Sequence, residues 1–201
     1  MSETNPSQLI KTWEDAGGKG HVVPLKDLQV KLIEIIRQSS ARTVAIADSL
    51  IVKENNLNAF LTSEGLEVIL PYQPTNVHLA KAMGLETDRE TYINNLSRAD
   101  LGISEATYGI GDTGTLAMVD RSGLGDPVSL LPPVSIALLR LERVVNSFKD
   151  ILPVFSSMSR VMLAPGNGLV LITGPSRTAD IEQVLIKGVH GPRIAHLVIL
   201  W

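Results

Sequence analysis

Short apolar runs, each bounded by Gly, Pro or polar residues, recur along the chain and limit what it can fold into. Examples are residues 43–47, 134–139 and 169–173. Runs this short and continuous are typical of strands buried on both faces, because a strand with one solvated face alternates apolar and polar residues. Stretches with helical spacing, such as residues 25–38, separate the runs. The alternation predicts an α/β fold in which helices flank a largely parallel sheet.

The same patterns give the expected elements. Strands are predicted at residues 20–23, 43–47, 67–70, 101–110, 115–119, 134–139, 169–173 and 194–200. Helices are predicted at residues 25–38, 88–98, 141–152 and 179–187, after a first helix that begins at Asn5-Pro6 and ends at Gly17-Gly18. Turn residues at 111–114 join two of the strands and predict a local β-hairpin addition. In a parallel sheet, ligands bind beyond the carboxyl ends of strands, so the loops that leave strands are the candidates for function.

Composition sets the size and class of the protein. The 201 residues are 44% hydrophobic and 19% charged, which predicts one globular domain over residues 1–201, with a helix within residues 1–20 packed on it. The formal net charge of −3 provides no positive field, so we expect no nucleic-acid partner. The sequence has neither a signal-peptide pattern nor an apolar run of about 20 residues, so we expect a cytoplasmic protein without membrane insertion.

Cysteine is absent from the chain. Disulfides, cysteine nucleophiles and iron–sulfur clusters ligated by these residues alone are therefore excluded. The four histidines, His21, His78, His190 and His196, show no close metal-ligand spacing, so we predict no bound metal. His196 lies inside the final predicted strand, and we expect its ring to satisfy a hydrogen bond in the core or at an interface.

The first candidate site is the loop that runs from the predicted strand at 169–173 into the predicted helix at 179–187. Free N–H groups at a helix start attract anions, and Gly174 permits a close approach of the backbone. Hydroxyl groups and a planar guanidinium would add donors. The candidate anion-binding residues are Thr173, Gly174, Ser176, Arg177 and Thr178. The alternative is that Ser176 or Thr178 merely caps the helix and that Arg177 is solvated.

The second candidate site is the turn within residues 109–115, where the spacing Gly-x-Gly-x-x-Gly formally matches a dinucleotide-binding fingerprint. A helix should follow that fingerprint, but residues 115–119 are apolar and extended, so we reject the match. Asp112 remains a candidate general base or nucleophile. The ligand contacts expected beside it are Thr113, Gly114 and Thr115. The alternative is an Asp that only bonds its own turn backbone.

The third candidate site is the loop at residues 187–193, just before the final predicted strand. Gly191-Pro192 turns the chain and leaves His190 in the loop, where it could donate to an anion or move a proton near neutral pH. Arg193 adds a cation for the same ligand. The alternative for His190 is a cap at the carboxyl end of the preceding helix.

These segments resemble a known family. The run Ile-Thr-Gly-Pro-Ser-Arg-Thr-Ala-Asp-Ile-Glu at residues 172–182, followed by residues 188–193, closely resembles the signature of the lactate-utilization protein C family, the LUD-domain proteins. Residues 112–115 and 130–133 support the resemblance. Two positions depart from the family pattern. Ser135 stands where the family often has His, and Asp112 stands where it often has Glu.

The resemblance implies a fold like that of ribose-phosphate isomerases, aminosugar-phosphate deaminases and CoA transferases. It also implies that the chain is a subunit of a system that oxidises L-lactate to pyruvate, beside two partner proteins that carry the iron–sulfur clusters. We then expect no cofactor on this chain and a small carboxylate or phosphate as its ligand. Two alternatives stay open: a stand-alone enzyme on sugar phosphates or CoA thioesters, and a non-catalytic metabolite-binding subunit.

Overall fold

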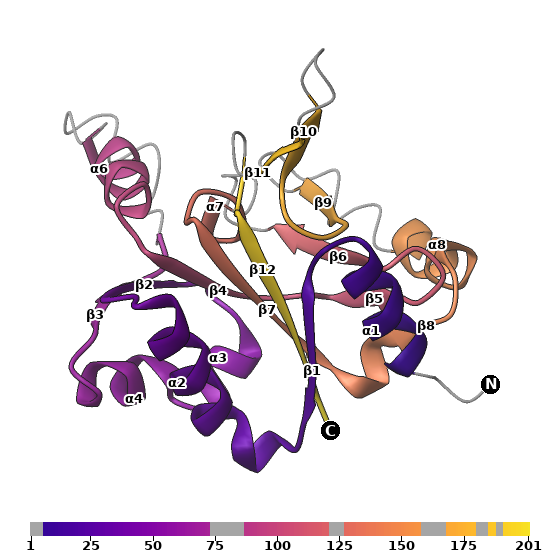
Figure 1. Cartoon of the computed structure of the whole chain (residues 1–201), viewed down its shortest axis with the longest axis horizontal. Coiled ribbons are helices and arrows are strands. Elements are labelled where there is room, and N and C mark those ends of the chain that lie inside the picture. The colour runs from indigo at the N-terminus through magenta and orange to yellow at the C-terminus, as the bar shows by residue number, and fades with distance from the viewer. Residues whose placement is uncertain (1–5, 73–86, 121–126, 158–167, 180–184, 188–190) are drawn as a thin grey trace.

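The centre of the protein is a six-stranded sheet in which every pair of neighbouring strands is parallel. This computed structural model describes residues 6–72, 87–120, 127–157, 168–179, 185–187 and 191–201. In spatial order the strands are β1 (Lys19–Val23), β12 (Ile194–Leu200), β7 (Val134–Arg140), β4 (Leu101–Glu105), β2 (Thr43–Ile46) and β3 (Glu67–Ile69). The predicted α/β fold with a largely parallel sheet flanked by helices is confirmed (Figure 1).

One face of this sheet is covered by helices. On β7, Val134, Ile136 and Leu138 all point to this face, because alternate residues of a strand share a side. They pack in one buried cluster with the apolar sides of the covering helices. These helices are α2 (Leu28–Ser39), α3 (Leu50–Glu54) and α4 (Leu57–Ser63), with the short 3-10 helix η1 (Leu25–Asp27) leading into α2.

The opposite face is covered by one helix and a second, smaller sheet. Helix α1 (Pro6–Asp15) buries Leu9 and Trp13 against it. The second sheet has the order β8 (Val144–Val145), β5 (Tyr108–Ile110), β6 (Thr115–Asp120) and β9 (Gly168–Ile172). The remaining helices on this side are α6 (Thr87–Leu96), α7 (Pro127–Leu130) and α8 (Phe148–Ser157), with the 3-10 helix η2 (Leu141–Arg143) before β8. Figure 1 shows α1 and this second sheet together on the side away from α2.

The predicted hairpin addition is confirmed and belongs to this second sheet. Strands β5 and β6 pair antiparallel across residues 111–114, and β9 pairs antiparallel with the other edge of β6. Part of the helix predicted at 141–152 is wrong, because Val144 and Val145 form β8 beside Gly109 and Ile110, and α8 begins only at Phe148. Within the described residues, no helix is long and apolar enough to cross a membrane.

The helix predicted at residues 179–187 is wrong. Its first residue ends β10 (Arg177–Ala179) and its last three form β11 (Leu185–Lys187). The two strands pair antiparallel, with Thr178 opposite Ile186. Both residues are β-branched and favour extended backbone, so antiparallel pairing between these two nearby segments overrides the weak helical spacing. The loop after β9 therefore leads into a strand and not into the start of a helix.

Candidate functional site

A group of small side chains lies on the second face of the central sheet, near the amino ends of its middle strands. Ser135 of β7 pairs with Gly102 of β4 on one side and with Ala195 of β12 on the other. Ala137 lies two residues further along β7 on the same face. Packed layers need large side chains to fill the space between them, so small residues here leave a hollow.

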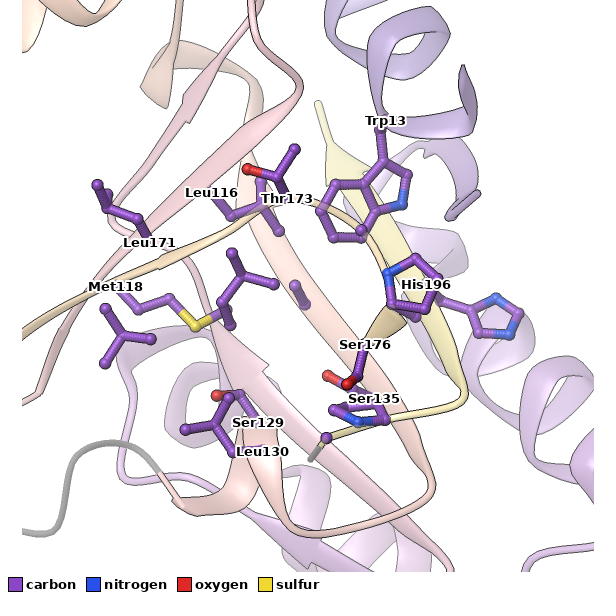
Figure 2. Close-up of a pocket in the computed structure, with 18 residues that line it drawn as sticks. Trp13, Leu116, Met118, Ser129, Leu130, Ser135, Leu171, Thr173, Ser176 and His196 are labelled. Carbon is purple, nitrogen blue, oxygen red and sulfur yellow. The ribbon is translucent and has the colours of Figure 1, made fainter. Parts of the chain in front are cut away.

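The hollow is a pocket of about 320 Å³ between the two sheets, and we call it the inter-sheet pocket. Ser135, Ala137 and Ala195 lie on its floor on the central sheet. Its walls are the α1 side chain Trp13, the β6 side chains Leu116 and Met118, and residues 170–172 of β9. Figure 2 shows Leu116, Met118 and Trp13 around the cavity, opposite the serines. The walls are therefore apolar.

The mouth of the inter-sheet pocket is built from two loops and carries hydroxyl groups. The Ser176 N–H donates to the Pro192 carbonyl oxygen at 2.9 Å, and this bond joins residues 173–176 to residues 191–193. The Arg193 N–H donates to the Pro133 carbonyl oxygen at 2.9 Å, which ties the second loop to the start of β7. Ser129 of α7 lines the pocket beside Ser135 and Ser176 (Figure 2). Small hydroxyls from three segments thus meet at one end of an apolar cavity.

Two of the three predicted candidate loops come together at this mouth. Thr173, Gly174 and Ser176 line the pocket, as do Gly191 and Pro192. Arg177 and Thr178 follow directly as the first two residues of β10. The Arg193 side chain is exposed at the foot of β12. The side chains of Arg177 and Thr178, and the whole of His190, lie outside the described residues, so their roles remain predictions.

The turn at residues 111–114 lies elsewhere. Asp112 and Thr113 are exposed, and neither lines the inter-sheet pocket. The Asp112 N–H donates to the Asn146 carbonyl oxygen at 2.9 Å, next to β8. Thr115 is the one member of this predicted group with a bond to the mouth loop, because its Oγ1 lies 2.8 Å from Thr173 Oγ1.

Gly114 and Gly174 have a structural task that the sequence did not suggest. Both have positive φ, +64° and +74°, and both lie against α1. A Cβ on Gly114 would lie 2.6 Å from the Thr12 carbonyl carbon, and one on Gly174 would lie 2.7 Å from the Ala16 carbonyl oxygen. The glycines therefore let α1 approach the two turns closely, which brings Trp13 to the pocket wall.

The inter-sheet pocket does not lie where the sequence analysis expects a ligand site, and that expectation stays a prediction. We expected the ligand site beyond the carboxyl ends of the parallel strands, but the inter-sheet pocket adjoins the amino ends of β7 and β12. The reason is the distribution of side-chain size. Ser135, Ala137 and Ala195 lie in the amino halves of these strands, whereas Leu139 and Leu197 further along fill the same layer.

His196 borders the pocket through its strand, but its ring belongs to the opposite face of the sheet. It shares that face with Val198, which packs toward α2, while Ala195 and Leu197 face the pocket side. In Figure 2 the His196 ring points away from the cavity. Its Nδ1 lies 3.0 Å from Nε2 of His21, and the two rings share a hydrogen bond, as expected for a core histidine.

The environment of the His21–His196 pair disfavours its charged form. Burial lowers the pKa of His196 to about 4, and His21, Lys19 and Lys31 act in the same direction. Burial and Lys31 also lower the pKa of His21, against the opposing effect of Glu34. In the described part of the chain, no three His, Cys, Asp or Glu residues are grouped so that they could hold a metal ion.

Sequence reasoning missed the apolar half of this site. Trp13 is 1% exposed and comes from the first helix, which was expected only to pack on the domain. Leu116 and Met118 are ordinary apolar residues of a strand and carry no motif. The small residues Gly102, Ser135 and Ala137 in strands that otherwise hold large apolar residues could have indicated a hollow. That inference requires knowing that β4 and β7 are neighbours, which the sequence does not show.

Several known proteins are similar to this chain. A family model described as the LUD domain matches residues 7–200. Lactate utilization protein C of Halalkalibacterium halodurans is 29% identical in an alignment 212 positions long, gaps included, that covers 99% of this chain and 82% of that protein. Lactate utilization protein B of Bacillus subtilis is 24% identical in an alignment 205 positions long that covers 83% of this chain and 41% of that protein. The chain thus spans less than half the length of this second relative.

A solved structure shares the fold. The crystal structure of a DUF162 family protein from Deinococcus radiodurans matches with a TM-score of 0.63 and 18% sequence identity. The match covers 98% of this chain and 99% of that one. At this identity the likeness concerns the arrangement of helices and strands alone.

Proposed function

Because the chain belongs to the LUD domain family, we propose that it works in lactate utilization, as a subunit that supports the oxidation of L-lactate to pyruvate. The relatives named lactate utilization proteins C and B support this role. The oxidation removes two electrons and two protons from the hydroxyl-bearing carbon of lactate and its hydroxyl group. The resemblance to the lactate-utilization protein C family implies that the electrons pass to iron–sulfur clusters on partner proteins. The lack of cysteine in this chain is consistent with that division of roles.

The part of this chain in that system is to hold the small carboxylate at the mouth of the inter-sheet pocket. The carrying observation is the bond from the Ser176 N–H to the Pro192 carbonyl oxygen, 2.9 Å long, which joins the two predicted anion loops. Arg177 follows Ser176 directly in the chain and supplies a planar guanidinium for a carboxylate. Thr178, His190 and Arg193 are the further donors on these loops, and the hydroxyl groups of Thr173 and Ser176 with the backbone N–H of Gly174 complete the proposed site.

A non-catalytic metabolite-binding role is the second candidate. The described residues that line the inter-sheet pocket include no carboxylate, lysine or arginine, and the ring of the one lining histidine, His196, bonds His21 on the opposite face. These features favour binding over proton transfer in the pocket. The stand-alone enzyme on sugar phosphates or CoA thioesters receives less support, because its candidate base Asp112 lies on an exposed turn outside the pocket lining.

The test is lactate-dependent dye reduction in extracts of cells that lack the protein. We expect the activity to disappear on deletion, to return with the wild type, and to stay at least tenfold lower with Arg177→Ala. The matched control is Arg37→Ala, which removes an exposed guanidinium on α2, on the far face of the sheet. Full activity with Arg177→Ala would remove the carboxylate site, and full activity after deletion would remove the role in lactate oxidation.

A further inference from the structure

We propose that the Ser135 hydroxyl binds the oxygen at C2 of the ligand, which is the hydroxyl group of a 2-hydroxy acid or the oxo group of the corresponding 2-oxo acid. The inference rests on the proposed function, since it takes the carboxylate to be held by the loops at the mouth of the inter-sheet pocket. It deepens that function by naming the residue that distinguishes lactate and pyruvate from acids without an oxygen at C2.

Ser135 carries a buried hydroxyl that the fold itself does not use. The residue is 6% exposed, and among the described residues its hydroxyl has no hydrogen-bond partner. Its neighbours across the sheet, Gly102 and Ala195, have no polar side chain, nor has Ala137 two residues along β7. An alanine would therefore pack as well, and a buried hydroxyl costs free energy unless water or a ligand bonds it. Because Ser135 lines the pocket, its hydroxyl is placed to bond a ligand there.

The open part of the inter-sheet pocket lies at its polar end, beside Ser135. The apolar side chains that face the pocket from α1, β6 and the floor are no more than 4% exposed and are already packed against their neighbours: Trp13, Leu116, Met118, Ala137 and Ala195. At the mouth, Thr173 is exposed and Ser176 is half-buried. The space for a ligand is therefore next to the hydroxyl groups, and it suits a small polar acid with a short side chain, as lactate is.

Hydrogen bonds hold Ser135 close to the loops that are proposed to bind the carboxylate. The Arg193 N–H donates at 2.9 Å to the carbonyl oxygen of Pro133, two residues before Ser135. The Ser176 N–H donates at 2.9 Å to the Pro192 carbonyl oxygen of the same loop. Figure 2 shows Ser135 and Ser176 at one end of the pocket. In a 2-hydroxy acid one carbon–carbon bond joins C2 to the carboxylate, so a carboxylate held at the mouth brings the oxygen at C2 toward Ser135.

A serine hydroxyl suits both members of a 2-hydroxy and 2-oxo acid pair. It accepts a hydrogen bond from the hydroxyl group of lactate, and it donates one to the oxo group of pyruvate. It stays neutral in both cases, so the same side chain serves the reduced and the oxidised ligand. Within the described part of the chain, no base bonds this hydroxyl, and the assignment is therefore to binding and not to proton transfer.

The test is binding of L-lactate, pyruvate and propanoate to the purified chain, measured by calorimetry. Propanoate has the same carboxylate and the same number of carbons, but no oxygen at C2. We expect Ser135→Ala to raise the Kd of lactate and of pyruvate about fivefold to tenfold, which is the usual effect of losing one hydrogen bond, and to leave the Kd of propanoate unchanged. Unchanged Kd values for lactate and pyruvate, or the same loss for all three acids, would overturn the inference.

The matched control is Ser104→Ala, which removes a buried hydroxyl from the neighbouring strand β4. Ser104 is 1% exposed, lies outside the pocket lining, and its Oγ is 4.0 Å from Met118 Sδ. The control should leave the Kd of all three acids unchanged. Thermal unfolding of both variants checks that each is folded. If Ser104→Ala weakens lactate and pyruvate as much as Ser135→Ala does, the effect comes from the packing of this layer and the inference fails.

A third variant separates this inference from the proposed carboxylate site. Arg177→Ala should weaken all three acids by a similar factor, because each has a carboxylate. An effect of Arg177→Ala without an effect of Ser135→Ala overturns the inference and leaves the carboxylate site standing. The reverse result overturns Arg177 as the carboxylate partner and supports the role of Ser135. No binding of any of the three acids to the wild type overturns the inference, while lactate-dependent dye reduction in extracts still decides the role in lactate oxidation.

Discussion

At the scale of single residues, the two positive-φ glycines beside α1 decide how the pocket wall is placed. Gly114 and Gly174 were predicted as ligand contacts, and the structure gives them close contacts with the α1 backbone at Thr12 and its continuation at Ala16. Thr12 Oγ1 also donates to the Gly111 carbonyl oxygen at 2.9 Å. The helix that carries Trp13 thus packs directly against the glycine-rich turn.

This leads to a prediction about Gly114→Ala. An Ala at φ +64° costs roughly 1–2 kcal/mol through its backbone conformation. The clash with the Thr12 backbone adds about 1–3 kcal/mol. The matched control is Gly65→Ala, where φ is +81° and a Cβ would meet nothing within 4 Å, so only the conformational cost remains. Urea denaturation of both variants measures the difference. Equal losses of unfolding free energy would show that α1 does not press on this turn.

Individual residues also show which parts of a site can be predicted from the sequence and which cannot. The strand-turn position of Thr173 and Ser176 follows from local patterns, and both reach the pocket mouth. The role of Trp13 depends on a contact between segments about a hundred residues apart, and no local pattern contains it. Asp112 is exposed and lies outside the lining of the inter-sheet pocket, so its role as a base or nucleophile stays a prediction.

At the scale of elements, buried strands were the most predictable parts. β2, β7 and β12 coincide closely with the expected runs, because continuous Val, Ile and Leu segments bounded by turns have few other stable forms. The segment that became β10 and β11 was not predictable in this way. Its apolar residues fit helical spacing as well as extended backbone, and antiparallel pairing between residues 177–179 and 185–187 decides its conformation.

The pair His21–His196 joins two elements, the edge strand β1 and its neighbour β12, and it predicts a pH dependence. Both pKa values are lowered in the folded state, that of His196 to about 4 from an ordinary value of 6.5. Between these pH values the unfolded chain binds more protons than the folded one. The contribution of the neutral pair to the free energy of unfolding is therefore complete above about pH 6.5 and is lost as the pH falls toward 4.

The measurement is the free energy of unfolding of the wild type and of His196→Asn at intervals from pH 7.5 to pH 4.5. We expect a shallower decline below pH 6.5 in the variant, in which the amide replaces the buried imidazole. Charged neighbours also act on His21: Lys31 and Lys19 lower its pKa, and Glu34 and Glu14 raise it. They are retained in the variant, so an unchanged slope would contradict the assignment to His196.

At the scale of the whole molecule, the first and the last strand, β1 and β12, pair with each other. The last strand, β12, lies between β1 and β7, so the first strand of the chain reaches the sheet only through the last one. The Leu25 N–H donates to the Trp201 carbonyl oxygen at 2.9 Å and continues this pairing. The presence of parallel strands followed from the sequence, but their order did not, because it depends on pairings across most of the chain length.

This topology predicts that removal of residues 194–201 abolishes folding. β12 buries Leu197, Val198, Ile199 and Leu200 at 3% exposure or less, and burial of these four contributes about 6–12 kcal/mol, close to the whole stability of a typical domain. Its loss also separates β1 from the rest of the sheet. Circular dichroism melting and size-exclusion chromatography should show no cooperative transition and an expanded or aggregated chain.

The control is removal of Trp201 alone, which is 65% exposed and takes part in two backbone hydrogen bonds, with Val23 and Leu25. Its loss should cost about 1–3 kcal/mol and keep a sharp transition. If the chain without residues 194–201 still unfolds cooperatively, the rest of the sheet folds without β12 and with β7 as its edge strand. The inter-sheet pocket would then have lost Ala195 from its floor, so ligand binding by that shortened chain would show that the floor depends on β7 alone.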